Sequence, residues 1–207
     1  MKERKMVEQP WTDNDHFMEQ QSDITKGYKS DTLQVVAIGD SVTYGYPYTP
    51  RESWVQLASQ RLGMTIVNRG EPGEITAEML ARFYPDVVSL NPSHVIILGG
   101  TNDAFSNIPA SSLRNNIYKM TEQAKAAGII PIIGLPIPVN DELSEVRLKS
   151  YRDWMREFAY GQGYQILDFY AALVDEVSGF IKVGYHDDGV HPNRKGYQAM
   201  SDIVYIR

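Results

Sequence analysis

The sequence predicts an α/β fold, in which crossover helices connect the strands of one parallel sheet. Short apolar runs alternate along the chain with stretches in which apolar residues recur at the helical period, and this alternation is typical of such folds. The length of 207 residues suits one domain with a full hydrophobic core. Apolar residues make up 43% of the chain and charged residues 22%, which indicates a globular protein rather than a disordered or fibrous one.

Five short apolar runs are the candidate strands. They are Gln34–Ile38, Met64–Asn68, His94–Leu98, Ile129–Leu135 and Tyr164–Leu167. Residues 1–32 precede the first run, are polar and show no sustained period, so we expect them to form an N-terminal extension. Residues 33–207 then form the domain.

Apolar stripes and capping residues predict the helices between these strands. Thr49 and Glu52 form a candidate capping box with Pro50 at the first helical position, ahead of a helix that carries Trp54, Leu57, Ala58 and Leu62 on one face. Gly128 and Gly163 are expected to end two longer helices. The remaining helices are expected at Thr76–Phe83, around Leu113, Ile117, Met120 and Ala124, around Leu148, Tyr151, Met155 and Phe158, and at Tyr197–Tyr205.

Charge and composition exclude several classes of function. The formal net charge is −6 and the pI is about 5.2, which argues against binding to nucleic acid or to an anionic membrane surface. The absence of cysteine excludes disulfides, thiolate metal ligands and a cysteine nucleophile. No apolar run approaches the roughly 18 to 20 residues of a membrane span, so no stable membrane insertion is expected. The first residues also lack the apolar stretch of a secretory signal, and we therefore expect a cytoplasmic protein.

Polar residues and glycines follow the carboxyl ends of the candidate strands. Ser41 lies just after the first strand, Gly70 and Gly73 just after the second, and Asn102 just after the third. Ligands bind at this edge in open α/β sheets. This shared position is evidence for one site, and it does not depend on which residues occupy it.

Ser41, Asp188 and His191 are the residue types that acyl transfer requires. A serine hydroxyl becomes nucleophilic when a base takes its proton, and a carboxylate fixes the tautomer of that base. Ser41 is expected at the exposed tip of a sharp turn after Gly39, and the alternative is that it caps a helix. Asp188 stands three residues before His191 and could orient its ring; the neighbouring Asp187 is the alternative partner.

Asn102 is the candidate donor to the oxyanion that acyl transfer forms. The alternative is that Asn102 and Asp103 are turn residues that bond to their own backbone.

A metal site is a minor alternative at the cluster of His186, Asp187, Asp188 and His191. The chain lacks an H-E-x-x-H motif or a similar scaffold, so we expect no metal. Neither a phosphate-binding loop nor a dinucleotide-binding motif is present, and we expect no cofactor. The histidines outside the acid–base segment are expected to be surface residues; they are His16, His94 and His186.

Read together, these segments resemble the GDSL-type lipases and esterases, also called the SGNH hydrolase superfamily, over about residues 33–206. The four blocks of that family correspond to Ser41 in Gly-Asp-Ser, a glycine in Asn68–Gly73, Asn102 in Gly-Gly-Thr-Asn-Asp and His191 in Asp-Gly-Val-His-Pro-Asn. The resemblance implies a flavodoxin-like three-layer α/β/α sandwich with a mostly parallel five-stranded sheet. It also implies a catalytic triad of Ser41, Asp188 and His191.

The resemblance further implies an oxyanion hole with three donors, the backbone N–H groups of Ser41 and Gly73 and the side chain of Asn102. Gly70 is the alternative to Gly73. One departure from the family pattern is Val42, because leucine usually follows the serine there; this change is conservative and should leave the mechanism intact.

The expected activity is hydrolysis of carboxylic esters through an acyl-enzyme, without a cofactor and on small or short-acyl esters, as in an esterase or lysophospholipase. An acetyl-carbohydrate esterase is the alternative within the enzyme class, and a non-catalytic ligand-binding domain is the alternative outside it. The candidate residues for the substrate pocket lie in loops expected to flank the nucleophile and include Tyr44, Tyr46, Tyr48 and Phe105.

Overall fold

The computed structural model describes residues 34–207, and the predicted N-terminal extension lies outside them. Five strands form one sheet in the order β2-β1-β3-β4-β5, and every neighbouring pair is parallel. The strands are β1 (Gln34–Gly39), β2 (Thr65–Gly70), β3 (His94–Leu98), β4 (Ile130–Gly134) and β5 (Gln165–Leu167). The predicted fold class is confirmed, with a flavodoxin-like strand order. All five predicted strands are present; β3 matches its predicted range, and the ends of the others differ by at most two residues.

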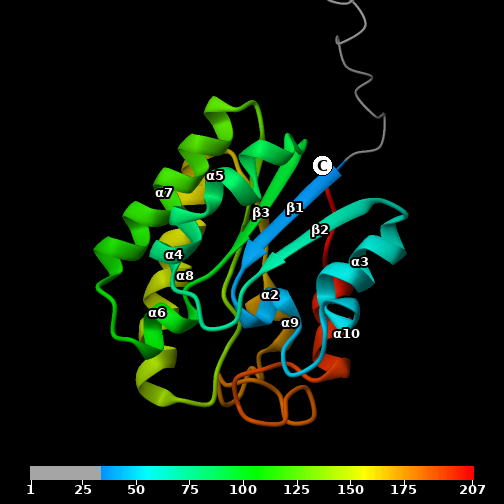
Figure 1. The fold of residues 1–207 in the computed structure, drawn as a ribbon. Coiled ribbons are helices and arrows are strands. Elements are labelled where there is room, and N and C mark those ends of the chain that lie inside the picture. The colour runs from blue at the N-terminus through cyan, green and yellow to red at the C-terminus, as the bar shows by residue number, and fades with distance from the viewer. Residues whose placement is uncertain (1–33) are drawn as a thin grey trace, which may run out of the picture. The chain divides into compact units, whose positions relative to one another are not determined.

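Helices cover both faces of this sheet (Figure 1). One face packs against α4, α5, α7 and α8, and the other against α3, α9 and α10. The helices are α2 (Ser41–Tyr44), α3 (Trp54–Leu62), α4 (Thr76–Ala81), α5 (Phe83–Asp86), α6 (Thr101–Phe105), α7 (Ala110–Ala126), α8 (Glu142–Gln162), α9 (Phe169–Leu173) and α10 (Arg194–Asp202), with 3-10 helices η1 (Pro50–Glu52) and η2 (Val88–Leu90).

Strand β1, an interior strand of the sheet, shows why such a strand reads as an unbroken apolar run. Val36 and Ile38 belong to the core on one face of the sheet, and Val35 and Ala37 belong to the core on the other. Because both faces are covered, neither set of side chains reaches water, and all four side chains are fully buried. Among the described helices, none is both long and apolar enough to cross a membrane.

The capping box predicted at Thr49 is wrong. Pro50–Glu52 forms a single 3-10 turn, and the Thr49 side chain caps no backbone N–H. Helix α3 begins four residues later than that box implies, at Trp54, because Ser53 has an extended backbone and its hydroxyl accepts the N–H of Gln56 at 3.3 Å. Thr49 has an extended backbone too, but its side chain makes no cap, whereas the extended backbone of Ser53 ends the 3-10 turn and its hydroxyl caps α3.

Two other predicted helices also have different boundaries, and the last one ends at Asp202 rather than Tyr205. The segment Thr76–Phe83 is interrupted at Arg82, where α4 ends and α5 begins. The last helix starts at Arg194 rather than Tyr197, because the side chain of Asn193 accepts the backbone N–H groups of Lys195 and Gly196. The short helices α2, α6 and α9 are absent from the sequence prediction, since four or five residues are too few to show a helical period.

The strand register aligns the segments that carry chemistry. Gly39 at the end of β1 lies opposite Gly70 of β2 on one side and Leu98 of β3 on the other. Chain connections leave β1 and β3 towards opposite edges of the sheet, so the carboxyl ends of these two strands form the topological switch point of the fold. The segments containing Ser41 and Asn102 begin there.

Candidate active site

Ser41 is the first residue of α2, directly after β1. The carboxylate of Asp40 caps this helix by accepting the N–H of Val42 at 2.9 Å. Asp40, and not Ser41, is therefore the N-cap of α2. Ser41 was expected at the exposed tip of a turn, but it is only 8% exposed, because α2 packs against the ends of the strands. Gly39 permits this close packing: a Cβ atom there would lie 2.2 Å from the Thr43 hydroxyl and 2.5 Å from the Leu98 carbonyl oxygen.

His191 connects Ser41 to Asp188 by hydrogen bonds. Its Nδ1 lies 2.6 Å from Oδ2 of Asp188, and its Nε2 lies 3.1 Å from Oγ of Ser41. An ionised carboxylate only accepts hydrogen bonds, so Nδ1 carries the ring proton and Nε2 offers its lone pair to the Ser41 hydroxyl. The structure thus brings together three residues separated by up to 150 positions, in the arrangement that proton transfer from serine requires.

Asp188, rather than Asp187, contacts the imidazole. Its Oδ1 accepts the backbone N–H groups of Val190 and His191 at 2.9 and 2.7 Å, which holds the carboxylate next to the ring nitrogen Nδ1. Partial burial opposes ionisation, but the hydrogen bonds from the His191 ring and from these backbone groups outweigh it and hold the pKa of Asp188 below its ordinary value. Asp187 instead lies 3.5 Å from the side-chain amide of Asn193.

Aromatic side chains border the histidine. The ring of Tyr46 contacts that of His191 edge-on, with 4.6 Å between ring centroids. The backbone carbonyl of Tyr46 accepts the hydroxyl of buried Tyr197 at 2.6 Å, which anchors this segment to α10. Of the other predicted pocket residues, Tyr48 packs against Tyr197, whereas Tyr44 and Phe105 stand at the ends of α2 and α6.

Asn102 lies on the first turn of α6, beside the loop that follows β2. Its amide nitrogen donates one hydrogen bond to the backbone carbonyl of Glu74, at 2.9 Å. A side-chain amide has two N–H groups, so a second donor remains. The same loop is tied to β1 by the N–H of Glu71, which donates to the carbonyl of Gly39 at 3.0 Å.

The two candidate glycines, Gly70 at the end of β2 and Gly73 in the loop, differ in whether their backbone N–H groups already have an acceptor. The N–H of Gly70 donates to the side chain of Asn68 at 2.9 Å and is therefore occupied. The N–H of Gly73 has no hydrogen-bond acceptor among residues 34–207. Gly73 has a positive φ of 87°, which few residues other than glycine adopt.

Two buried acids next to the site were not assigned a role from the sequence. Burial raises the pKa of Asp40 to about 7, although the hydrogen bond from Val42 favours the charged form. Asp103 accepts the backbone N–H and the hydroxyl of Thr76, at 2.9 and 2.6 Å, and so fastens α4 to α6. The side chain of Asp103 therefore bonds across the fold to α4, and a hydrogen bond from its own backbone N–H also favours its charged form. No signal in its sequence context indicates this long-range contact.

The remaining histidines have structural contacts. Nδ1 of His186 accepts the N–H of Gly189 at 2.8 Å, which removes that lone pair from any metal. Residues 34–207 contain no group of three or more acidic or histidine side chains placed to hold a metal ion. His94 was expected at the surface but is buried, because its ring lies between the Ser93 hydroxyl and the carbonyl of Arg207. His16 lies outside the described residues.

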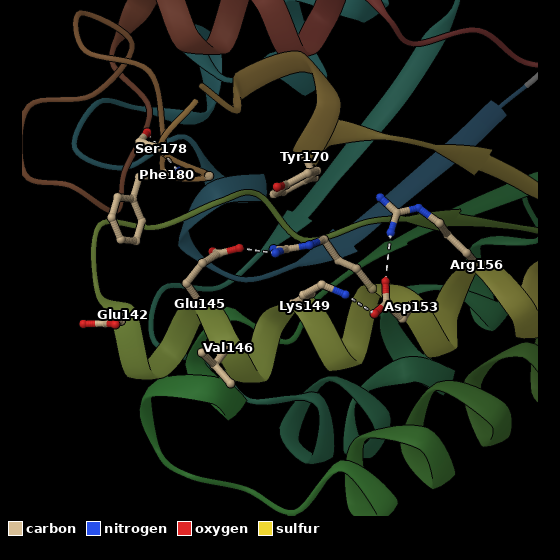
Figure 2. A pocket seen from close by; sticks show the side chains of 11 residues that line it. Glu142, Glu145, Val146, Lys149, Asp153, Arg156, Tyr170, Ser178 and Phe180 are labelled. Carbon is tan, nitrogen blue, oxygen red and sulfur yellow. Dashed lines mark hydrogen bonds and ion pairs between the residues drawn. The ribbon is translucent and has the colours of Figure 1, made fainter. Parts of the chain in front are cut away.

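A separate cavity of about 320 Å³ lies beside α8 (Figure 2). Side chains of α8, Tyr170 of α9 and the segment Ser178–Phe180 line it, and no member of the Ser41–His191–Asp188 cluster does. Its charged groups are largely paired with one another, in the ion pairs Arg152–Glu145, Lys149–Asp153 and Arg156–Asp153. The cavity therefore offers no excess charge that would select a ligand.

Residues 37–199 match the model of the GDSL-like lipase/acylhydrolase family, and the chain belongs to this family. The structure is similar to that of a lipolytic protein of the G-D-S-L family from Desulfitobacterium hafniense, with a TM-score of 0.78 and 31% identity over 83% of this chain and 97% of that one. Together with the curated relatives, these similarities identify the chain as an ester hydrolase.

The curated relatives carry different names. An arylesterase of Vibrio mimicus is 24% identical over 83% of this chain and 86% of its own length. The thioesterase 1/protease 1/lysophospholipase L1 of Escherichia coli is 25% identical over 84% of this chain and 81% of its own. A Bacillus subtilis lipoprotein, YqeF, is 31% identical over 55% of this chain, and the match spans about half of that protein (51%).

Proposed function

We propose that this chain hydrolyses carboxylic esters through an acyl-enzyme on Ser41. The observation that carries the proposal is the continuous pair of hydrogen bonds from Ser41 Oγ to His191 Nε2 and from His191 Nδ1 to Asp188. In this arrangement a single proton shift to His191 creates the nucleophile, and the resulting imidazolium faces an ionised carboxylate.

In the first half-reaction, Oγ of Ser41 attacks the ester carbonyl carbon while its proton moves to Nε2 of His191. The tetrahedral intermediate collapses when His191 returns this proton to the leaving alcohol oxygen, and the acyl group remains on Ser41. In the second half-reaction, His191 takes a proton from water, whose oxygen attacks the acyl carbon. The proton then passes to Oγ as the carboxylic acid departs.

The negative oxygen of each intermediate needs donors aimed at it. We assign this role to the N–H of Ser41, the N–H of Gly73 and the second amide hydrogen of Asn102. The first position of a helix has no intrahelical acceptor for its N–H, so the Ser41 group is free to bind the oxyanion. The unoccupied N–H of Gly73 and the occupied one of Gly70 support Gly73 as the second donor.

For the substrate we propose small or short-acyl esters, on the support of exposed aromatic rings next to His191 and on the helix that carries Asn102. Tyr46 is 45% exposed against His191, and Phe105 is 43% exposed on the same short helix as Asn102. Rings in these positions can pack against an aryl or small alkyl group of the ester. The Vibrio mimicus relative is named an arylesterase, which is consistent with this class. The cytoplasmic location expected from the sequence stays a prediction.

Covalent labelling tests the assignment of Ser41. A fluorophosphonate probe should add to Ser41, and the adduct should be located by mass spectrometry. Ser41→Ala should lower turnover on the order of 10³-fold to 10⁶-fold. Ser59→Ala, which removes a hydroxyl of α3 that donates to the Met64 carbonyl, should retain wild-type turnover. An adduct on a different serine, or full activity of Ser41→Ala, would falsify the assignment. Nitrophenyl esters of about two to twelve carbons and acetylated sugars, compared on the active protein, then define the acyl and alcohol preference.

A further inference from the structure

Arg82 binds several backbone segments at the catalytic edge of the sheet. It stands between α4 and α5, with its side chain 16% exposed. Its Nη2 donates to the carbonyl oxygens of Gly39, at 3.1 Å, and Arg69, at 3.0 Å. Its Nε and Nη2 contact both carboxylate oxygens of Glu74 at 2.6 to 2.9 Å, and its Nη1 donates to Asp86 at 2.8 Å.

The groups that Arg82 binds belong to the segments that supply the proposed oxyanion donors. Gly39 stands two residues before Ser41, at the end of β1. Glu74 follows Gly73, and its carbonyl holds the amide of Asn102. One guanidinium therefore connects, directly or through one further hydrogen bond, the segments of all three donors.

The charge of Arg82 is well suited to this role. Burial opposes ionisation of the guanidinium, but the carboxylates of Glu74 and Asp86 outweigh it and raise the pKa of Arg82 above its ordinary value. The fork of a guanidinium can bind a carboxylate and backbone carbonyls at the same time, which an ammonium cannot do with the same geometry. If Arg82 were replaced by a neutral residue, the partly buried carboxylate of Glu74 would lose this charge partner.

We propose that Arg82 is a positioning residue of the oxyanion hole, which fixes the Gly73 N–H and the Asn102 amide relative to Ser41. The inference rests on the proposed function, because it acts on the donors named there. Displacement of such donors by about 1 Å can cost roughly a hundredfold in rate. Arg82 touches no reacting atom in this scheme and acts through Glu74 and the strand ends.

A matched control separates this role from a contribution to stability alone. Arg61 also donates to two backbone carbonyls, those of Ser201 and Val204, but these lie at the carboxyl end of α10. Loss of either arginine removes carbonyl contacts of the same kind. Arg61→Gln should therefore lower stability and leave kcat unchanged, whereas Arg82→Gln should lower kcat.

The test combines steady-state kinetics with a double-mutant cycle. Arg82→Gln should lower kcat by about tenfold to a hundredfold with a KM within about twofold of the wild type. Arg82→Lys keeps the positive charge but not the fork of the guanidinium, so its kcat should lie between those of the wild type and Arg82→Gln. In an Asn102→Ala background the effect of Arg82→Gln on kcat should be smaller than in the wild type by about threefold or more, because the part that acts through the Asn102 amide is already gone and only the Gly73 N–H remains to be displaced.

An unchanged kcat in folded Arg82→Gln would overturn the inference, as would an equal loss in both backgrounds. Should Arg82→Gln fail to fold, Glu74→Gln decides the question: it keeps the carbonyl bound to Asn102 and removes the charge that Arg82 binds. Its kcat must then fall about tenfold, and an unchanged value would equally overturn the inference. Failure of the proposed function has a different signature, since Ser41→Ala would then remain active.

Discussion

The oxyanion donor Asn102 allows the proposed mechanism to be tested quantitatively. Its amide is held in place before substrate arrives, because one N–H is bonded to the Glu74 carbonyl at 2.9 Å. A donor oriented in this way needs no reorganisation when charge develops, and its removal typically costs about 10²-fold to 10³-fold in kcat, or roughly 3 to 4 kcal/mol. Asn102→Ala should therefore lower kcat by this factor with little change in KM, since the oxygen carries full charge only in the intermediate.

Asn102→Asp is the matched control, because it keeps the shape of the side chain and replaces the donors by acceptors. Its carboxylate would face both the Glu74 carbonyl and the developing oxyanion, so the loss in kcat should be at least as large as for alanine. Both variants also lose the bond to Glu74, which should lower the free energy of unfolding by about 1 kcal/mol.

The assay is hydrolysis of a short nitrophenyl ester, with urea unfolding measured on the same samples. A raised KM with an unchanged kcat would show that Asn102 binds the ground state of the substrate or merely shapes the turn. A variant with Asp at this position that kept wild-type kcat would refute donation altogether. Fluorophosphonate labelling of Ser41 should slow but persist in both variants, because the nucleophile and its base remain.

The remaining predictions concern stability and the acid–base loop. Asp40→Asn keeps an oxygen to cap α2 and removes a carboxyl whose pKa burial raises from 3.8 to about 7. Since the unfolded chain releases that proton near pH 4 and the folded chain near pH 7, wild type should lose up to about 4 kcal/mol relative to the variant as pH rises between these values; a constant difference in urea unfolding from pH 4 to 8 would contradict this. Asn140→Ala removes an amide whose oxygen accepts the N–H of Ile181 at 3.2 Å and whose nitrogen lies 3.2 Å from His186. It should lower kcat about threefold to tenfold through a looser His191, with Ser41 labelling slowed in parallel, and an unchanged labelling rate would exclude it from the acid–base machinery.

The sheet could be predicted from the sequence because its three interior strands, β1, β3 and β4, are apolar on both faces. Burial between two layers of helices leaves no polar alternation, so runs such as His94–Leu98 stand out from the amphipathic helices. The helix starts at Thr49 and Ser53 were harder to distinguish. Both are good capping residues with an extended backbone, and only the structure shows that the side chain of Ser53, not that of Thr49, accepts a backbone N–H.

Two kinds of site residue could be predicted from the sequence: residues that directly follow a strand, and pairs whose short spacing in the chain brings their side chains together. Ser41 and Asn102 follow neighbouring strands, and the spacing of three residues lets Asp188 bond both the ring and the backbone N–H of His191. Arg82 carried no such signal. Its partners lie up to 43 residues away, and an arginine between two short helices looks like any solvated residue in the sequence.

The structure anchors the two halves of the proposed machinery separately. Arg82 holds the strand ends that carry the nucleophile and the oxyanion donors, through Gly39 and Glu74. Asn140 holds the loop of the acid and base, with its own N–H donating to the carbonyl of Gly189 at 2.7 Å in addition to its side-chain contacts. Because these two anchors share no hydrogen-bond partner among residues 34–207, the losses in kcat from Arg82→Gln and Asn140→Ala should multiply in the double variant. A product well below that expectation would mean that the strand ends and the acid–base loop move as one unit.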